Sequence, residues 1–176
     1  MNCPNCGAPL QPAPGKNYLA CEYCASFYFP EKSMDGVRIL GEAADLDCPV
    51  CRQPLLTAVI EAFPLEHAHS LDDHFSALAC ASCRGLLLHQ ADLPPILRQL
   101  RGRADGPPIP ARPFAPQELG RRLACPRCGK RMDTHPYGGP GNVVIDNCMD
   151  CGLVWLDSDE LGKIAHAPGR DRTTQE

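Results

Sequence analysis

Twelve cysteines, all of them in Cys-x-x-Cys pairs, are the residues of this sequence best suited to do chemistry. A thiolate is a good ligand for Zn²⁺, and two such pairs supply the four ligands of a tetrahedral site. Sequential pairs are grouped because a metal-binding ribbon closes its site with adjacent hairpins. The expected ligand sets are Cys3, Cys6, Cys21 and Cys24; Cys48, Cys51, Cys80 and Cys83; and Cys125, Cys128, Cys148 and Cys151.

A secreted protein would use twelve cysteines for disulfides instead. The chain starts Met1-Asn2-Cys3, without the basic and apolar regions of a signal peptide, and it has no apolar run near the ~18 residues that span a bilayer. We therefore expect a cytoplasmic protein that binds metal and does not associate with a membrane. Iron in place of zinc, as in rubredoxins, and redox cycling of dithiols stay open as alternatives.

The elements that position these cysteines must be small. The cysteine pattern divides the 176 residues into units that seldom bury enough core to fold alone. A structural zinc compensates, since its binding energy of roughly 10–16 kcal/mol in zinc-finger peptides is also folding energy. The expected fold class is small, metal-stabilised and β-rich: three tandem zinc ribbons with rubredoxin-like knuckles, and short helices after ribbons 2 and 3.

The chain divides at changes in composition. Five of the eleven residues from Gly106 to Pro116 are proline, which predicts an extended spacer that limits contacts between the second and third ribbons. The predicted units are ribbon 1 at 1–40, ribbon 2 with an acidic, histidine-containing insert and a helix at 41–103, the linker at 104–116, ribbon 3 at 117–166, and a disordered tail at 167–176.

Alternation and turn residues locate the expected elements. Strands are predicted at 25–29, 55–60, 86–88 and 142–146, with a short strand at 37–40 inside a segment, 31–47, that otherwise has the composition of a linker. Residues 134–141 are predicted to be an irregular loop. A helix is expected at 92–100, with prolines in its first turn, and another is expected to begin at 157–161 with an acidic cap.

The third unit carries a family resemblance. Its motifs are Cys-Pro-x-Cys-Gly from Cys125, Val-Val-Ile-Asp-x-Cys-x-x-Cys-Gly from Val143, and Trp-Leu-Asp-x-x-Glu-Leu from Trp155. It resembles the bacterial transcription-factor zinc-finger family, whose ribbon is similar to that of transcription factor IIB, over about residues 124 to 162. The whole chain resembles bacterial proteins with three such ribbons. The resemblance implies the ribbon fold and zinc.

Basic residues are concentrated in one stretch, although the formal net charge of the chain is −4. Arginine suits phosphate groups, so this stretch is the candidate contact with a polyanion. Ordinary solvated side chains are the competing explanation. The candidates are Arg98, Arg101, Arg103, Arg112, Arg121, Arg122, Arg127, Lys130 and Arg131.

For several other residues a structural role is a better explanation than a functional one. The insert holds His67, His69 and His74 among acidic residues, and a solvated acidic loop explains them better than a catalytic metal site. His135, before a proline, is expected to be structural. Trp155 is expected to be a core residue that covers the third metal site. The aromatic residues of the first unit are better explained by a small core than by a platform for stacking bases: Tyr18, Tyr23, Phe27, Tyr28 and Phe29.

Three classes of function remain on this evidence. The first is a zinc-binding, non-enzymatic adaptor of several ribbons that docks on a macromolecule, with a protein as the expected partner. The second is a nucleic-acid-binding, transcription-related ribbon protein that uses residues 98–131. The third is a rubredoxin-like iron or dithiol redox protein. The sequence shows no nucleophile–base pair or phosphate loop, so we expect no enzyme and no small-molecule substrate.

Overall fold

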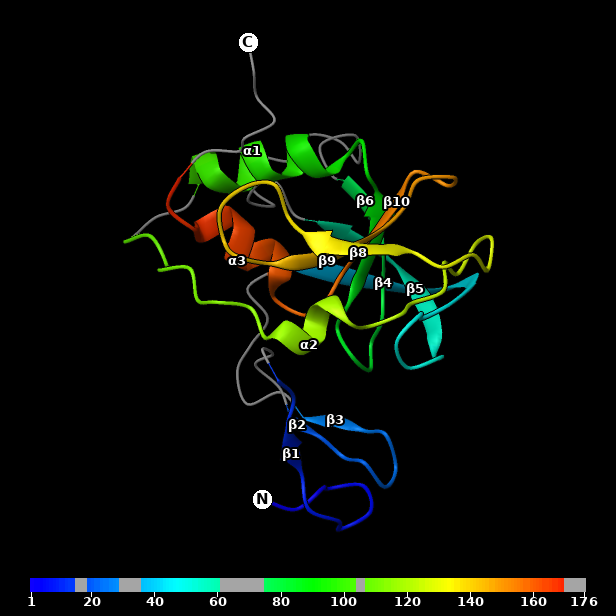
Figure 1. The fold of residues 1–176 in the computed structure, drawn as a ribbon. Helices are drawn as coiled ribbons and strands as arrows, with labels where there is room; N and C mark the ends of the chain where they lie inside the picture. The colour runs from blue at the N-terminus through cyan, green and yellow to red at the C-terminus, as the bar shows by residue number, and fades with distance from the viewer. Residues whose placement is uncertain (15–18, 29–35, 61–74, 104–106, 170–176) are drawn as a thin grey trace.

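The computed structural model describes residues 1–14, 19–28, 36–60, 75–103 and 107–169. These residues form a three-stranded sheet in the first ribbon and a seven-stranded sheet in the remainder. The two sheets are separate, and the first ribbon lies at one end of the larger body (Figure 1). The chain is therefore a β-rich protein with tandem zinc ribbons and short helices, as the sequence predicts.

The strands and helices are short, apart from β4 and α1. The elements are β1 (Gln11–Pro12), β2 (Leu19–Ala20), β3 (Phe27–Tyr28), β4 (Val37–Asp47), β5 (Pro54–Ile60), β6 (Phe75–Ala79), β7 (Leu86–His89), α1 (Leu93–Arg103), α2 (Pro116–Leu119), β8 (Asp133–Pro136), β9 (Val144–Cys148), β10 (Leu153–Leu156) and α3 (Glu160–His166).

The second and third ribbons share one sheet, in the order β4-β5-β6-β7-β10-β9-β8. The junction is the antiparallel pair β7–β10, in which Leu86 lies opposite Leu156 and Leu88 opposite Val154. Helices α1 and α3, one from each ribbon, also pack against each other. The expectation that the proline-rich segment limits contacts between these ribbons is therefore wrong. They form one body.

Each face of this sheet has its own apolar cluster. Leu86, Leu88, Val154 and Leu156 lie in the cluster under α1 and α3. The alternate residues Leu87, Leu153 and Trp155 lie in a second cluster, together with cysteines of the second and third metal sites. Because successive side chains of a strand point to opposite faces, β7 and β10 are buried on both sides.

Several element boundaries differ from the sequence-based expectations. Of the segment 31–47, the structure describes residues 36–47, and strand β4 occupies all of these except residue 36, in place of the expected linker with a short strand at 37–40. Strand β4 also crosses the boundary predicted between residues 40 and 41. Residues 134–136, expected to be irregular, belong to β8. Strand β5 and helices α1 and α3 confirm the elements predicted at 55–60, 92–100 and 157–161. Residues 107–115 have no helix or strand, as predicted for the linker.

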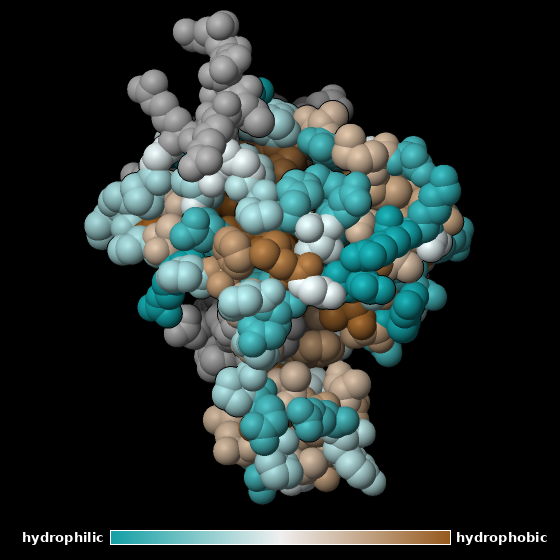
Figure 2. Space-filling model, viewed as in Figure 1, coloured by the Kyte–Doolittle hydropathy of each residue, from teal (hydrophilic) through white to brown (hydrophobic). Residues whose placement is uncertain are grey.

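The linker nevertheless touches the body, because the backbone N–H of Ile109 donates to the carbonyl oxygen of His166 at 2.9 Å. At the end of α3, Ala167 is buried, and residues 170–176 of the expected tail lie outside the described residues. Within the described part of the chain, no helix has the length and apolar character needed to cross a membrane. Figure 2 shows hydrophilic residues over much of one face of the molecule, with apolar residues between them.

Gly85, which precedes β7, holds the two ribbons in close contact. A Cβ atom at this position would lie 2.1 Å from Cζ2 of the fully buried Trp155. We therefore expect Gly85→Ala to lower the free energy of unfolding by about 3 kcal/mol, the upper part of the usual range for overpacking. Urea unfolding followed by the emission of Trp155, the single tryptophan, measures this loss.

Gly102→Ala is the matched control, since a Cβ at Gly102, in α1, meets no heavy atom within 4 Å. This variant should be as stable as the parent or slightly more so, because alanine favours helix over glycine. Equal unfolding midpoints for the two variants would contradict the close packing of Gly85 against the indole ring.

Candidate metal centres

The twelve cysteines form three groups of four, and the ligand atoms of each group lie within 4.8 Å of one another. The groups are the three sets predicted from the sequence. Sulfur–sulfur distances include 3.6 Å for Cys3–Cys24, 3.4 Å for Cys51–Cys80 and 3.6 Å for Cys128–Cys148. A disulfide bond is about 2.05 Å long, and all twelve cysteines are free.

These distances fit a metal ion at the centre of each group. In a tetrahedral site with Zn–S bonds of about 2.3 Å, neighbouring sulfurs lie about 3.8 Å apart. The three separations quoted above are slightly shorter and the remaining ones are at most 4.8 Å, so a cation could bind with small movements of the sulfurs. A tetrahedral set of four sulfurs is typical of zinc and of iron. The sites are therefore metal-binding centres of the zinc-ribbon type.

All six Cys-x-x-Cys knuckles share one backbone conformation. The residue after the second cysteine has a positive φ in every case: Gly7 at 78°, Ala25 at 53°, Arg52 at 63°, Arg84 at 59°, Gly129 at 72° and Gly152 at 61°. In four knuckles the N–H of this residue donates to the carbonyl of the first cysteine at 2.8–3.0 Å. Glycine is favoured there, and the second ribbon adopts the same turn with arginine at both positions.

The knuckles of the second ribbon also turn backbone donors toward sulfur. The N–H of Cys51 lies 3.5 Å from Sγ of Cys48, and the N–H of Cys83 lies 3.4 Å from Sγ of Cys80. Such contacts stabilise thiolate charge and orient the ligand. In the second site, hydrogen bonds from the Cys48 and Cys83 side chains lower the pKa of Cys80 to about 2. Four sulfurs this close compete for protons, which a divalent cation displaces.

The second site is more buried than the first and third, which each have two buried, one half-buried and one exposed cysteine. In the second site, Cys48, Cys80 and Cys83 are buried and Cys51 is half-buried. They pack in one apolar cluster with Trp155 and with cysteines of the third site. Trp155 thus covers both of these sites, whereas the sequence placed it over the third alone.

The first site is packed against a much smaller apolar cluster than the other two. Its apolar cluster contains three buried residues, Cys3, Leu10 and Cys21, and Cys6 is exposed. Polar side chains surround the sulfurs here: the Ser26 hydroxyl lies 2.6 Å from Sγ of Cys24. This hydrogen bond is the largest cause that lowers the pKa of Cys24 to about 6. Of the three sites, the first therefore has the least apolar packing around it, and we expect it to be the easiest for a chelator to reach.

A buried charged network lies beside the third site. Arg121 donates from Nη2 to Asp146 and from Nη1 to Asp157. The indole N–H of Trp155 donates to Asp157 at 2.8 Å, and the Thr134 hydroxyl donates to Asp146. Burial opposes the charge of Arg121, but the two carboxylates outweigh it and raise its pKa. This network has no local signature in the sequence, because Asp146 and Asp157 are 25 and 36 residues from Arg121.

Some of the basic residues proposed to contact a polyanion have partners within the fold, and others are exposed to solvent. Arg121 is bound in the network, and Arg101 donates to the carbonyl of Ile164 at 3.2 Å. Lys130 forms an exposed ion pair with Asp150. The side chain of Arg103 is outside the described residues. Those that are solvent-exposed are Arg98, Arg112, Arg122, Arg127, Lys130 and Arg131.

The remaining candidates do not form a further site among the described residues. The insert histidines, His67, His69 and His74, lie outside them, as do Tyr18 and Phe29. Nε2 of His135 lies 2.9 Å from the side-chain nitrogen of Asn147, which supports a structural role.

The described aromatic residues of the first ribbon do not share one surface. Tyr23 is 84 % exposed at the tip of a knuckle. Phe27 packs toward the second and third sites, whereas Tyr28 packs in the core of its own ribbon. Of the three, only Tyr23 thus presents most of its surface to solvent.

Comparison with known proteins supports the ribbon assignment for the third unit. Residues 124–167 match a family model described as Transcription factor zinc-finger, the TFIIB-type zinc ribbon. This match confirms the resemblance inferred from the motifs around Cys125, Cys148 and Trp155. Neither the comparison with curated proteins nor that with solved structures gives a match.

Proposed function

We propose that the chain is a zinc-binding, non-enzymatic adaptor that docks on a partner protein. The observation that carries this proposal is that each metal centre offers four sulfur ligands within 4.8 Å of one another. Such a site leaves no open position for a substrate or an activated water, so its metal stabilises structure. The metal then holds together small ribbons whose outer surfaces remain available for contact.

Zinc is the proposed metal, because four-cysteine sites of ribbon type bind it as a closed tetrahedral complex. We expect three zinc ions per chain in protein purified without chelator, measured by elemental analysis. Iron at the same sites would give visible absorption, and dithiol cycling would give disulfides instead of metal. Fewer than two metal ions per chain would contradict the assignment.

The sites should lose zinc in order, with the first site before the other two, because its apolar cluster is much the smallest. During titration with a chelator, the first equivalent of zinc should leave without a change in the emission of Trp155. The later equivalents should shift that emission to the red, because the indole ring is fully buried beside the second and third sites. An absorbing zinc indicator and fluorescence, read from one sample, measure both events.

Cys6→Ser is the matched control for this order, since Cys6 is an exposed ligand of the first site. The variant should bind two zinc ions and lack the early phase, with its tryptophan emission unchanged. A red shift that accompanies the first equivalent of zinc in the parent protein would contradict the order.

The proposed docking is tested by affinity capture from cells followed by mass spectrometry, with the metal-loaded chain and the metal-stripped chain compared. A partner retained by the loaded chain alone supports an adaptor whose surface depends on zinc. Equal capture by both forms would mean that binding does not need the folded ribbons.

Binding of nucleic acid is the second candidate function. It is favoured by Arg122, Arg127 and Arg131, which are exposed near the first knuckle of the third site. Changing these three to glutamine should reduce the slope of log affinity against log salt by up to about 0.7–0.9 for each lost phosphate contact. Arg121 must be left intact because it is part of the fold. Fluorescence anisotropy with DNA and RNA measures the slope, and absence of binding near 0.1 M salt excludes this function.

A further inference from the structure

The longest strand, β4, lies at one end of the seven-stranded sheet. Within the described part of the chain, it pairs with β5 and with no other strand. Eight of its eleven residues are exposed. The backbone N–H and C=O groups of an unpaired edge are a template for another strand. We call the outer side of Val37–Asp47 the β4 edge.

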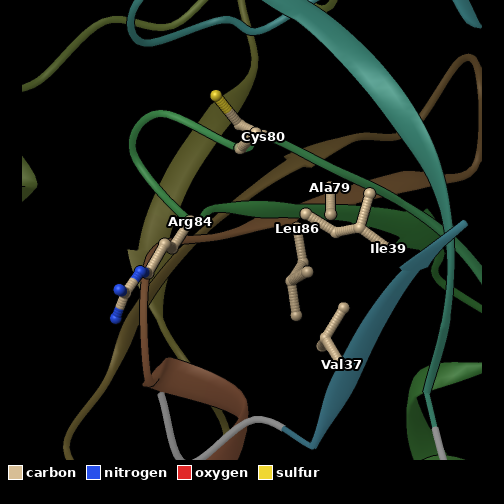
Figure 3. Close-up of a pocket in the computed structure, with 7 residues that line it drawn as sticks. Val37, Ile39, Ala79, Cys80, Arg84 and Leu86 are labelled. Atoms are coloured by element: carbon tan, nitrogen blue, oxygen red, sulfur yellow. The ribbon is translucent and has the colours of Figure 1, made fainter. Parts of the chain in front are cut away.

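Apolar side chains occupy the first half of the β4 edge. Ile39 is 41 % exposed and Leu40 is 54 % exposed, and as neighbours in a strand they point to opposite faces. Ile39 and Val37 also line a cavity of about 200 Å³, together with Ala79 and Leu86. In Figure 3 these side chains face one another, and the sulfur of Cys80 points away from them. The cavity can accept an apolar side chain from outside the molecule.

Acidic side chains occupy the second half. Glu42, Asp45 and Asp47 are exposed, and none of them forms an ion pair with another described residue. The strand has one basic residue, Arg38. A partner strand with positive charge at this end is therefore favoured by electrostatic complementarity.

A second copy of this chain fits the β4 edge less well. It would bring three more carboxylates and one arginine, so the two strands would carry net charge of the same sign. The register of β4 against β5 also shifts between Ile39 and Ala43, and again between Ala43 and Asp47. Such bulges curve an edge strand and interrupt its pairing with any added strand, so it is the charge that disfavours a second copy relative to a basic segment.

We propose that the β4 edge binds an extended segment of a partner protein, which adds to the sheet as an antiparallel strand. Its first residues would be basic and lie opposite the acidic half of β4, and a bulky apolar side chain further along would enter the cavity. Backbone hydrogen bonds supply affinity in this mode, and the cavity and charges supply specificity. The proposal rests on the proposed adaptor function and assigns it a surface.

The test uses the full metal-loaded chain and a fluorescein-labelled peptide of ten residues. Lysine alternates with threonine in its first half, and leucine alternates with threonine in its second. Two companion peptides have glutamate in place of lysine, or N-methyl groups on alternate amides. Anisotropy should show binding of the parent peptide and none of the N-methylated one, because β-strand addition requires the amide donors.

The protein variants test where the peptide binds. Glu42→Lys combined with Asp45→Lys should weaken the parent peptide about tenfold and favour the glutamate peptide. Glu22→Lys combined with Asp133→Lys makes the same change of charge at exposed positions elsewhere, and it should have little effect. Ile39→Lys should also weaken binding, since it places a charge at the cavity.

Three results would overturn the proposal: no binding of the parent peptide at 1 mM, equal binding of the N-methylated peptide, or equal affinities of the two double variants. A fourth overturning result could come from sedimentation velocity. If the parent chain were a dimer and the Glu42→Lys/Asp45→Lys variant a monomer, the β4 edge would bind a second copy of the chain. If cellular partners are still captured by the Glu42→Lys/Asp45→Lys variant, the adaptor function stands and this surface is wrong.

Discussion

Replacing Cys148 by serine is expected to unfold the second and third ribbons together and to leave the first ribbon with its metal. Cys148 is a buried ligand of the third site and the last residue of β9, which pairs with β10. Its loss removes part of a metal-binding energy that is also folding energy, on the order of 10–16 kcal/mol for a structural zinc. Since β10 pairs with β7 and Trp155 packs beside both sites, the damage extends to the second ribbon.

Limited proteolysis, elemental analysis and tryptophan emission together measure this outcome. New cleavage sites should appear between β4 and β7 as well as between β8 and β10, and the emission of Trp155 should shift to the red. Cys6→Ser is the control, with cleavage confined to residues 1–28 and unchanged emission. If Cys148→Ser left residues 36–60 as resistant to protease as in the parent, the shared sheet would not be a cooperative unit.

Arg121→Ala is expected to lower the free energy of unfolding by roughly 3–5 kcal/mol, the cost of removing one partner from a buried ion pair. The carboxylate side chain of Asp146 is fully buried and that of Asp157 is 7 % exposed, so both would lose their cation without gaining water. Urea unfolding of the metal-loaded protein measures the loss. The reason for the size of the effect is desolvation of the two carboxylates left behind.

Two comparisons test that reason. Lys130→Ala breaks the exposed pair with Asp150 and should change stability very little, because solvent screens that pair. In the background of Asp146→Ala, the Arg121→Ala change should cost less than it does alone, since contacting residues are energetically coupled. Strictly additive costs would show that the guanidinium does not stabilise these carboxylates.

The metal sites could be predicted from sequence because their information is local. Each knuckle is four residues of fixed spacing, and the turn residues after Cys6 and Cys128 are glycine. Strand β5 could be predicted for the same reason, because its apolar composition is also a local feature of the sequence. The network of Arg121 could not be predicted in this way: its partners are distant in the chain, and its arginine has the same sequence signature as its exposed neighbour Arg122.

The junction of the second and third ribbons has a signature in the sequence. Residues 86–88 and 153–156 are continuous apolar runs, and a strand with one solvated face would alternate instead. Both runs are buried on both faces in the shared sheet. The full length of β4 could not be predicted, because Gly41 and the acidic residues of this strand give it the composition of a linker. The same acidic residues suit a strand at an exposed edge. Pro136 similarly argued against the end of β8, which among the described residues pairs with β9 alone in the sheet.

The β7–β10 pair also sets an order of events during protein synthesis. Leu86 and Leu156 are 70 positions apart, so the ribosome must make nearly all of the third ribbon before this pair can form. Until then, a nascent second ribbon presents β7 as an open edge with three consecutive leucines. Such edges are prone to aggregate, and closing a long loop slows folding. Folding of the second ribbon thus finishes after translation of the third, and during that interval the exposed leucine edge is open to aggregation.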